Sequence, residues 1–179
     1  MLAKGRGQLD VITSARLAWY PHQLASDYAR LSLAYSFAGI IDHIAQDRHS
    51  QPELYAHLSD GLRAIEDNGG DGLTELWFKL RVLNLIGLRP ALQNCFACGR
   101  QDGQSIYHLD PAHGIVCASC APATARSISV DGIKLWRWLC DHPTKTAIQI
   151  VGATELAEAT LPDCESFMEH HLGKSFRRI

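Results

Sequence analysis

Apolar residues recur at three- and four-residue steps over much of the chain, which is the spacing of helices that bury one face. The first such stretch runs from Leu24 to about Arg48. Because it is apolar on two adjacent stripes, we expect this helix to be central. The stripes are Leu24, Tyr28, Leu31, Tyr35, Ala38, Ile41 and Leu33, Phe37, Ile40, Ile44.

Further helices follow at similar spacing. Pro52 stands where a first helical turn tolerates proline, and the glycine-rich stretch 68–72 ends that helix. The next helix runs from about Leu73 to Ile86, because Gly87 and Pro90 are typical of the residues after a helix C-terminus. A further helix is expected at Val130–Cys140, and one or two more after Thr144, the last of them at roughly Pro162–Leu172.

Residues 1–20 have a different pattern, with β-branched residues near the end of Gln8–Thr13. This segment is typical of a hairpin arm or edge strand. A lone hairpin is not stable in water, so the segment looks like the end of a larger unit. Two more strands are expected at 105–109 and 114–116. The pattern therefore predicts a mainly helical chain with a small β element.

Composition narrows the class of protein. The chain has 179 residues, of which 46% are apolar and 20% charged, as in ordinary globular domains. No run approaches the ~20 apolar residues of a membrane-spanning helix, and the N-terminus lacks the apolar stretch of a signal peptide. We therefore expect a cytoplasmic protein without a membrane segment.

The net charge of −2 gives no strongly basic footprint for nucleic acid. Charge is unevenly distributed, however. Residues 1–20 carry three Lys or Arg against one acid, and residues 21–94 carry six against nine. The last residues, after Glu169, are basic only. Any contact with nucleic acid is therefore expected to be local.

Two Cys-x-x-Cys pairs are the strongest chemical signal. Cys95 and Cys98 are separated from Cys117 and Cys120 by eighteen residues, a spacing typical of a four-cysteine zinc site. Each pair directs two sulfurs at one ion, and two pairs complete a tetrahedron. The sequence therefore predicts one structural Zn²⁺ in a ribbon over residues 93–125. Four thiolates leave no open position for a catalytic water.

Alternatives to this zinc site are weaker. Disulfides require an oxidising compartment, which nothing here indicates. A thiol redox motif normally accompanies a βαβ pattern, which is absent. His108 or His113 could replace a cysteine, although the paired cysteines suffice. Cys140 and Cys164 lie on apolar helix faces and are expected to be small buried residues.

Motifs of catalysis are missing from the sequence. It contains no phosphate-binding Gly-x-x-x-x-Gly-Lys-Ser/Thr loop, no Gly-x-Ser-x-Gly elbow and no His-Glu-x-x-His pair. The adjacent His170 and His171 point about 100° apart on a helix, so they do not readily share a ligand. We therefore do not expect an enzyme.

Several motifs together resemble the RecO family of bacterial recombination mediators in DNA repair. A Gly5–Leu9 strand enters a helical domain, and a helix ends in Leu85–Pro90 before Cys95–Arg100. A second cysteine pair follows, and the chain closes with His171–Ser175. The resemblance covers nearly the whole chain and is most specific from Trp77 to Arg100.

The resemblance implies a division of the chain. Residues 1–20 match the end of an N-terminal OB-fold, most of which is absent, and residues 21–179 match the helical domain with its zinc ribbon. It also implies binding to single- and double-stranded DNA, to RecR and to the acidic, apolar C-terminal tail of the single-stranded DNA-binding protein (SSB). These acts assist RecA loading and strand annealing at the nucleoid. Without the barrel, DNA binding is expected to be weak.

Candidate DNA-contacting residues are the cations near the chain ends, because phosphates need positive charges or guanidinium groups. Solvated termini that only keep the protein soluble are an equally simple interpretation. Arg100 is a weaker candidate. The predicted DNA-binding residues are Lys4, Arg6, Lys174, Arg177 and Arg178.

The family resemblance places the SSB-tail pocket partly on the helix Leu73–Ile86, with Phe78, Lys79 and Arg81 as candidate contacts. Apolar side chains of the tail need a pocket, and its carboxylates need Lys or Arg. Trp77 and Phe78 are adjacent, so we expect one in the core and the other available to a partner. Packing of both is the alternative.

Three hypotheses follow for the function. The leading one is a non-enzymatic DNA-repair mediator of the RecO kind. The second is a zinc-ribbon scaffold that binds only proteins, which salt-dependent DNA binding would distinguish. The third is a thiol redox enzyme, which predicts disulfide exchange that zinc-locked thiolates would not show.

Overall fold

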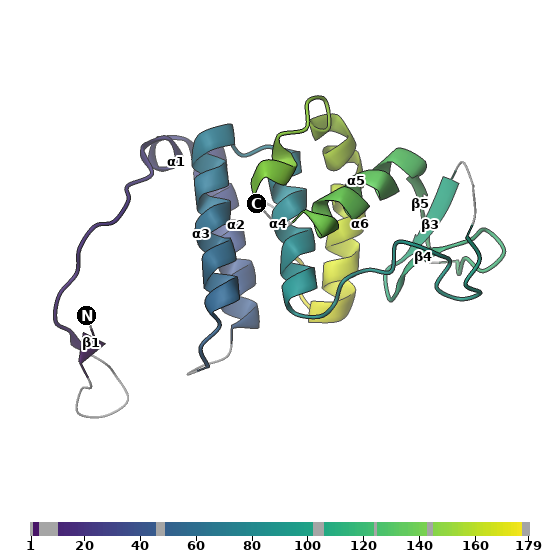
Figure 1. Ribbon diagram of the computed structural model, residues 1–179, viewed down its shortest axis with the longest axis horizontal. Coiled ribbons are helices and arrows are strands. Elements are labelled where there is room, and N and C mark those ends of the chain that lie inside the picture. The colour runs from purple at the N-terminus through teal and green to yellow at the C-terminus, as the bar shows by residue number, and fades with distance from the viewer. Residues whose placement is uncertain are drawn as a thin grey trace.

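The computed structural model describes residues 2–3, 11–45, 49–101, 106–123, 125–142 and 145–176. Helices dominate these residues, and short strands form two antiparallel sheets, which confirms a mainly helical chain with a small β element (Figure 1). The helices are α1 (His22–Ser26), α2 (Tyr28–Ile44), α3 (Pro52–Asn68), α4 (Gly72–Leu85), α5 (Val130–Asp141), the 3-10 turn η1 (Lys145–Ile148) and α6 (Thr154–Leu172). The strands are β1 (Leu2–Ala3), β2 (Val11–Ile12), β3 (Ile106–Asp110), β4 (Gly114–Val116) and β5 (Arg126–Ser129).

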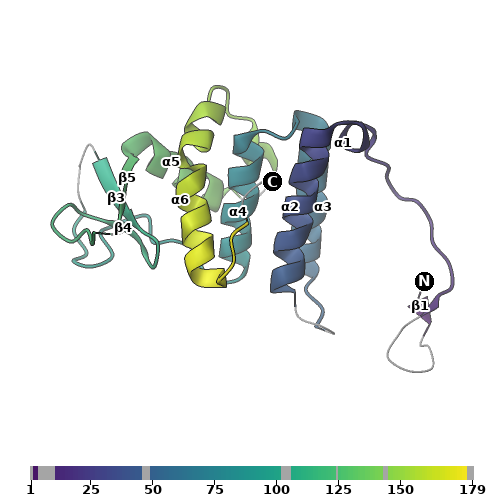
Figure 2. The ribbon, with the colours of Figure 1, turned by 180° about the vertical axis from the view of Figure 1, so that it is seen from behind.

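The elements follow one another along the long axis of the molecule. Helix α3 contacts both α2 and α4, and α4 contacts α5 and α6. The three-stranded sheet lies at the far end of this row, and the β1–β2 pair lies at the opposite end, reached by an extended segment (Figures 1 and 2). The pairing of β1 with β2 fits the hairpin predicted for residues 1–20. Its origin in an OB-fold stays a prediction.

The predicted helix from Leu24 to Arg48 is divided in two by Asp27. The backbone of Asp27 is extended, and its carboxylate accepts hydrogen bonds from the N–H groups of Ala29 and Arg30 at 2.8 and 3.1 Å. This side-chain cap starts a new helix, because the first N–H groups of a helix have no partner inside it. Helix α2 then ends at Ile44, and residues 46–48 lie outside the described part of the chain.

Helix α4, and not the first predicted helix, lies at the centre of the bundle. Nearly all of its side chains are buried, because α3, α5 and α6 surround it. In α2, Phe37 packs inward, but Tyr28 and Tyr35 of the other stripe are 79% and 72% exposed. The prediction that the first helix is central is therefore wrong. Tyrosines share the spacing of apolar residues, yet their hydroxyl groups also suit a surface.

Helix α6 begins at Thr154, eight residues before the predicted start, and encloses Pro162. A proline inside a helix loses one hydrogen bond and costs about 3 kcal/mol, so the sequence favours a start there. Tertiary contacts outweigh this cost. Ala157 and Thr160 are buried, and the Thr160 hydroxyl accepts a hydrogen bond from the indole N–H of Trp136 in α5 at 3.1 Å.

The three-stranded sheet has the order β4–β3–β5. Strands β3 and β4 match the predictions at 105–109 and 114–116. Strand β5 was not predicted, although the alternation in Arg126–Ser129 is a strand signal, with Ile128 buried between exposed neighbours. Ser129 then caps α5 by accepting a hydrogen bond from the Gly132 N–H at 3.0 Å. The sheet is therefore continuous with the helical bundle.

Candidate metal centre and partner surfaces

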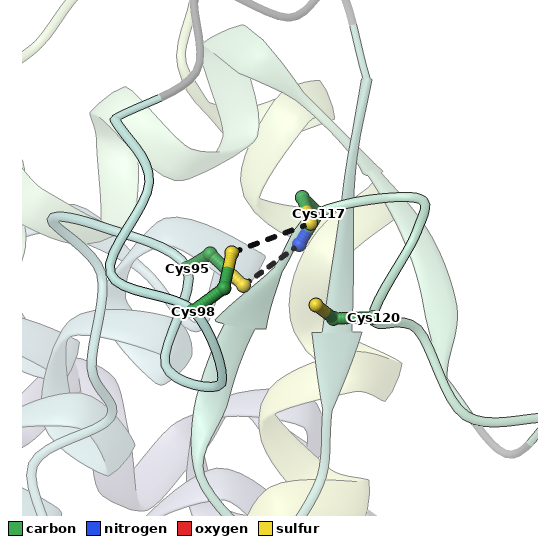
Figure 3. Close-up of side chains that lie close together, drawn as sticks. All are labelled: Cys95, Cys98, Cys117 and Cys120. Atoms are coloured by element: carbon green, nitrogen blue, oxygen red, sulfur yellow. Dashed lines mark hydrogen bonds between the residues drawn. The ribbon is translucent and has the colours of Figure 1, made fainter.

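The first cysteine pair sits on a closed turn between α4 and β3. The Cys95 N–H donates to the Arg100 carbonyl at 3.0 Å, and the Gly99 N–H donates to the Cys95 carbonyl at 2.8 Å. Gly99 has a φ of 71°, a left-handed conformation that residues with a side chain rarely adopt. These bonds direct the sulfurs of Cys95 and Cys98 toward the same side of the turn (Figure 3).

The second pair follows β4 directly. The Cys120 N–H donates to the Cys117 carbonyl at 2.9 Å, which closes a similar turn. The two turns are also joined, because the Cys117 N–H donates to the Cys95 sulfur at 3.3 Å (Figure 3). The Ala91 N–H donates to the His113 carbonyl at 2.9 Å, and the Ile115 N–H donates to the Ala91 carbonyl at 2.8 Å. These two bonds hold β4 beside the chain that leads to the first pair.

All four sulfurs lie within 4.8 Å of one another. The Cys98 and Cys117 sulfurs are 3.8 Å apart, close to the ~3.8 Å edge of a tetrahedron whose metal–sulfur bonds are ~2.3 Å long. All of the described cysteines are free, so no disulfide competes for these sulfurs. Among the described residues, this cluster contains no histidine. The four predicted ligands can therefore hold one metal ion.

The negative charges that these four thiols carry when ionised would also be stabilised by a bound cation. Burial alone raises the pKa of Cys95, but N–H groups from Cys117 and Cys98 outweigh burial and lower the pKa to about 6. Hydrogen bonds with Cys117 and Cys98 raise the pKa of Cys120 to about 12. Four sulfurs this close cannot all ionise cheaply without a positive charge among them. A bound cation removes that conflict.

The other two cysteines are inert. Cys140 and Cys164 are buried in the helical core, and burial raises the pKa of both thiols, that of Cys140 to about 11. A nucleophilic cysteine needs the opposite shift. The prediction that both are small buried residues is confirmed.

Helix α4 does not present its predicted partner-binding residues at the surface. Phe78 and Lys79 are fully buried, and only Arg81 is partly exposed. Phe78 stacks on Phe37 of α2 with ring centroids 3.7 Å apart. Trp77 is fully buried as well, so neither adjacent aromatic is available to a partner, and the alternative that both are packed is confirmed. Neighbouring residues of a helix can both be core when helices surround it.

Lys79 has internal partners. Its ammonium group lies 2.7 Å from a carboxylate oxygen of Glu75 and 2.7 Å from one of Glu165, and all three side chains are buried. The ammonium group therefore bridges two carboxylates between α4 and α6. The polar residues of α4 therefore do not mark a solvent face, which the sequence alone could not reveal.

Of the predicted DNA-contacting residues, the structure places only Lys174. Lys4, Arg6, Arg177 and Arg178 lie outside the described residues. Lys174 is exposed after the end of α6, with its ammonium group 5.7 Å from the centre of the Phe176 ring.

Lys174 belongs to a groove that sequence reasoning missed, because its tyrosines were assigned to the core. The segment after α6 turns back toward α2, where His43 contacts the Leu172 carbonyl at 3.1 Å and the edge of the Phe176 ring (Figure 2). We call the resulting hollow of about 390 Å³ the α2 groove. It is mostly apolar, and its main lining residues are Tyr28, Leu31, Tyr35, Gly39, Lys174 and Phe176.

Among the described residues, no helix is both long and apolar enough to cross a bilayer.

Comparison with known proteins agrees with this architecture. A family model described as "Recombination protein O C terminal" matches residues 25–178. The chain is 30% identical to the "DNA repair protein RecO" of Desulfatibacillum aliphaticivorans over 96% of this chain and 69% of the relative. It is 28% identical to the protein of the same name from Roseiflexus sp. (strain RS-1), over 99% of this chain and 62% of the relative.

A third relative, from Desulfitobacterium hafniense (strain Y51), is 26% identical over 99% of this chain and 66% of its own length. The chain thus spans about two thirds of the length of these curated relatives. The family match covers the helical bundle and the cysteine ribbon together. The chain therefore belongs to the RecO family of DNA repair proteins.

Proposed function

We propose that this chain is the helical and zinc-ribbon portion of a non-enzymatic recombination mediator in the bacterial cytoplasm. It would bind single- and double-stranded DNA, the SSB tail and RecR, and so assist RecA loading and strand annealing. The observation that carries this proposal is the RecO family match over residues 25–178. With a net charge of −2, the chain by itself would bind DNA weakly.

We further propose that the metal is a single Zn²⁺. Four thiolates are the donor set typical of structural zinc, and the sulfur spacing fits a tetrahedron. All four protein ligands come from Cys95, Cys98, Cys117 and Cys120, so the ion would hold the two turns together and bind no substrate. Its contribution would be to the folding of the ribbon.

For the SSB tail, the α2 groove is the accessible site that best matches the chemistry. An acidic, apolar peptide needs apolar walls and a cation, and the groove offers Tyr28, Tyr35 and Phe176 beside Lys174. Phe78 would act indirectly, because it stacks on Phe37 and so supports the helix that carries the groove. Lys79 is held inside by its two glutamates, and Arg81 is the partly exposed candidate cation of α4, outside the residues that line the groove.

Fluorescence anisotropy of a labelled SSB-tail peptide, with a scrambled peptide as control, tests this proposal. We expect specific micromolar binding that Tyr35→Ala and Lys174→Gln both weaken. Tyr55→Ala is the matched control, because Tyr55 is equally exposed but lies on α3 outside the groove. Equal binding of the two peptides, or equal effects of Tyr35→Ala and Tyr55→Ala, would contradict the proposed site.

A scaffold that binds only proteins is the second candidate, and the mildly acidic charge of the chain favours it. It predicts no DNA affinity at low salt. The mediator predicts affinity that falls steeply as salt rises, because phosphate contacts release counterions.

A further inference from the structure

The stretch from Leu76 in α4 to Gln101, just after the first cysteine turn, carries four Lys or Arg residues and no Asp or Glu. The link between α4 and the first cysteine pair contains one of them, Arg89. Lys79 is buried in the core, whereas Arg89 and Arg100 are both exposed. This local charge differs from the rest of the acidic middle of the chain.

A groove of about 510 Å³ runs along this link, and we call it the linker groove. Its wall is rigid, because the Arg137 guanidinium of α5 donates to the Leu92 carbonyl at 2.7 Å and to the Gln93 carbonyl at 3.4 Å. Arg89 lies beside this wall, and one of its guanidinium nitrogens is 2.5 Å from a carboxylate oxygen of Asp141 in α5. The other guanidinium N–H groups can donate to a ligand. Its main lining residues are Arg89, Leu92, Gln93, Asn94, Phe96 and Gly99.

Phe96 gives the groove an aromatic end. It stands between the two cysteines of the first turn and is 54% exposed, although metal binding requires no aromatic there. The ring of Phe96 stacks on that of His113, with centroids 4.1 Å apart and planes 16° from parallel. The contact orients the ring, while a ring so exposed still offers surface to a ligand.

We propose that the linker groove binds single-stranded nucleic acid, with an unpaired base stacked on Phe96 and backbone phosphates beside Arg89 and Arg100. Base–aromatic stacking with flanking cations is the usual chemistry of single-strand binding. The amides of Gln93 and Asn94 supply donors and acceptors for a base edge. This inference rests on the DNA binding proposed above and assigns a site for it.

The arrangement of charge favours this orientation of the strand. Arg100 follows Cys98 by two residues, so a phosphate near the cysteine end of the groove would meet its guanidinium group, while a neutral base would lie against Phe96. The guanidinium of Arg89 marks the opposite end, where a phosphate gains a charge-assisted hydrogen bond.

The test is an anisotropy titration of a labelled oligothymidine and of a duplex of equal length, with the metal-loaded full chain at low salt. Phe96→Leu should weaken single-strand binding about tenfold, because it removes the π-face while keeping an apolar side chain. Duplex binding should change little, since paired bases are already stacked. Phe96→Tyr should retain the affinity, and Tyr55→Leu is the matched control on α3.

A second pair of variants tests the phosphate contact. Arg100→Gln should lower the salt dependence of single-strand binding by about 0.7 in the slope of log K against log salt. Lys145→Gln, which removes an exposed cation at η1, should leave the slope unchanged. Metal content and thermal unfolding of each variant show whether the fold is intact. If Phe96→Leu loses metal, the proposed site is tested instead by the salt slope of Arg100→Gln and by the single-strand affinity of Phe96→Tyr.

The results of these titrations distinguish failure of the linker site from failure of the proposed DNA binding. Single-strand binding that is insensitive to both Phe96→Leu and Arg100→Gln overturns the linker site but leaves the proposed DNA role. No single-strand binding by the unmodified chain overturns both. Variants that lose RecR binding but keep DNA affinity would make the groove a protein-docking surface and overturn the nucleic-acid assignment.

Discussion

The two ends of the ribbon are stabilised differently. At the sheet end, Leu109, Ile115 and Ile128 are buried in the main hydrophobic core with α5 and α6. At the cysteine end, the buried cluster among the described residues consists of Cys95, Val116 and Cys117. Two of these three residues are candidate metal ligands. The sheet end therefore folds by apolar burial, whereas the cysteine end has almost no core of its own.

The two ends of the ribbon also differ in the free energy that apolar burial contributes. A fully buried Leu, Ile or Val contributes about 1.5–3 kcal/mol, and the cysteine end has one such residue in Val116. Metal–thiolate bonds replace the missing core in ribbons of this kind. One chain therefore joins a bundle with its own apolar core to a turn region whose four cysteines can hold a metal ion. Four experiments test this difference, from the largest expected effect on the bundle to the smallest.

The largest effect is expected from Lys79→Met. The substitution leaves two buried carboxylates, those of Glu75 and Glu165, without the lysine that bridges them, and loss of one partner of a buried ion pair costs about 3–5 kcal/mol. Denaturant unfolding measures it. Lys145→Met is the matched control, because its pair with Asp67 is exposed and is expected to contribute less than about 1 kcal/mol. Equal losses would contradict the internal role of Lys79.

Acidification should give the next largest effect, through His57. This side chain is buried beside Trp77 and Phe78, and burial lowers its pKa from 6.5 to about 4. The folded state therefore resists protonation. Stability is fully present above about pH 6.5 and is lost as the pH falls toward 4, by about 2 kcal/mol at pH 5.

Unfolding of the parent chain and of His57→Gln at pH 7 and pH 5 isolates this contribution from that of the carboxylates. The glutamine can still donate to the Phe78 carbonyl, which His57 contacts at 3.1 Å, but it does not titrate. The parent chain should lose more stability between the two pH values. Parallel losses in both proteins would show that His57 takes no part.

A smaller effect is expected at the start of α4. The Asp71 carboxylate accepts a hydrogen bond from the Thr74 N–H at 2.8 Å and another from the Thr154 hydroxyl at 3.3 Å, so it caps α4 and ties it to α6. Asp71→Ala should cost about 1 kcal/mol in thermal or denaturant unfolding. Asp131→Ala, at an exposed first-turn position of α5, should cost about half of that or less.

Metal removal should affect the bundle least and the cysteine end most. Chelation, or Cys95→Ala, should expose the turn after Cys98 while the main unfolding transition changes little, because the core contains none of the ligands. Trypsin cleavage after the exposed Arg100, followed by mass spectrometry, measures the opening. Arg63, on α3, is the internal control site. Unchanged cleavage after Arg100 would contradict a structural metal.

Local signals predicted much of the architecture. The strands β3 and β4, the helices α3, α4 and α5 and the four clustered cysteines all lie where spacing placed them, because caps, turns and ligand pairs are set by neighbours in the chain. The errors have a common cause. The centrality of α4, the continuation of α6 through Pro162 and the burial of Phe78 and Lys79 each depend on partners distant in sequence.

Short-range spacing in the sequence was enough to predict the helices α3, α4 and α5, the positions of the cysteine turns and the family that the chain resembles. Tertiary structure decided which stripe of α2 faces outward and which cations remain free. Lys79 illustrates the reason, because its partner Glu165 is 86 positions away. The residues next to a lysine in the sequence do not reveal whether its ammonium group lies in water or between two buried carboxylates. Only the packing of α4 against α6 distinguishes them.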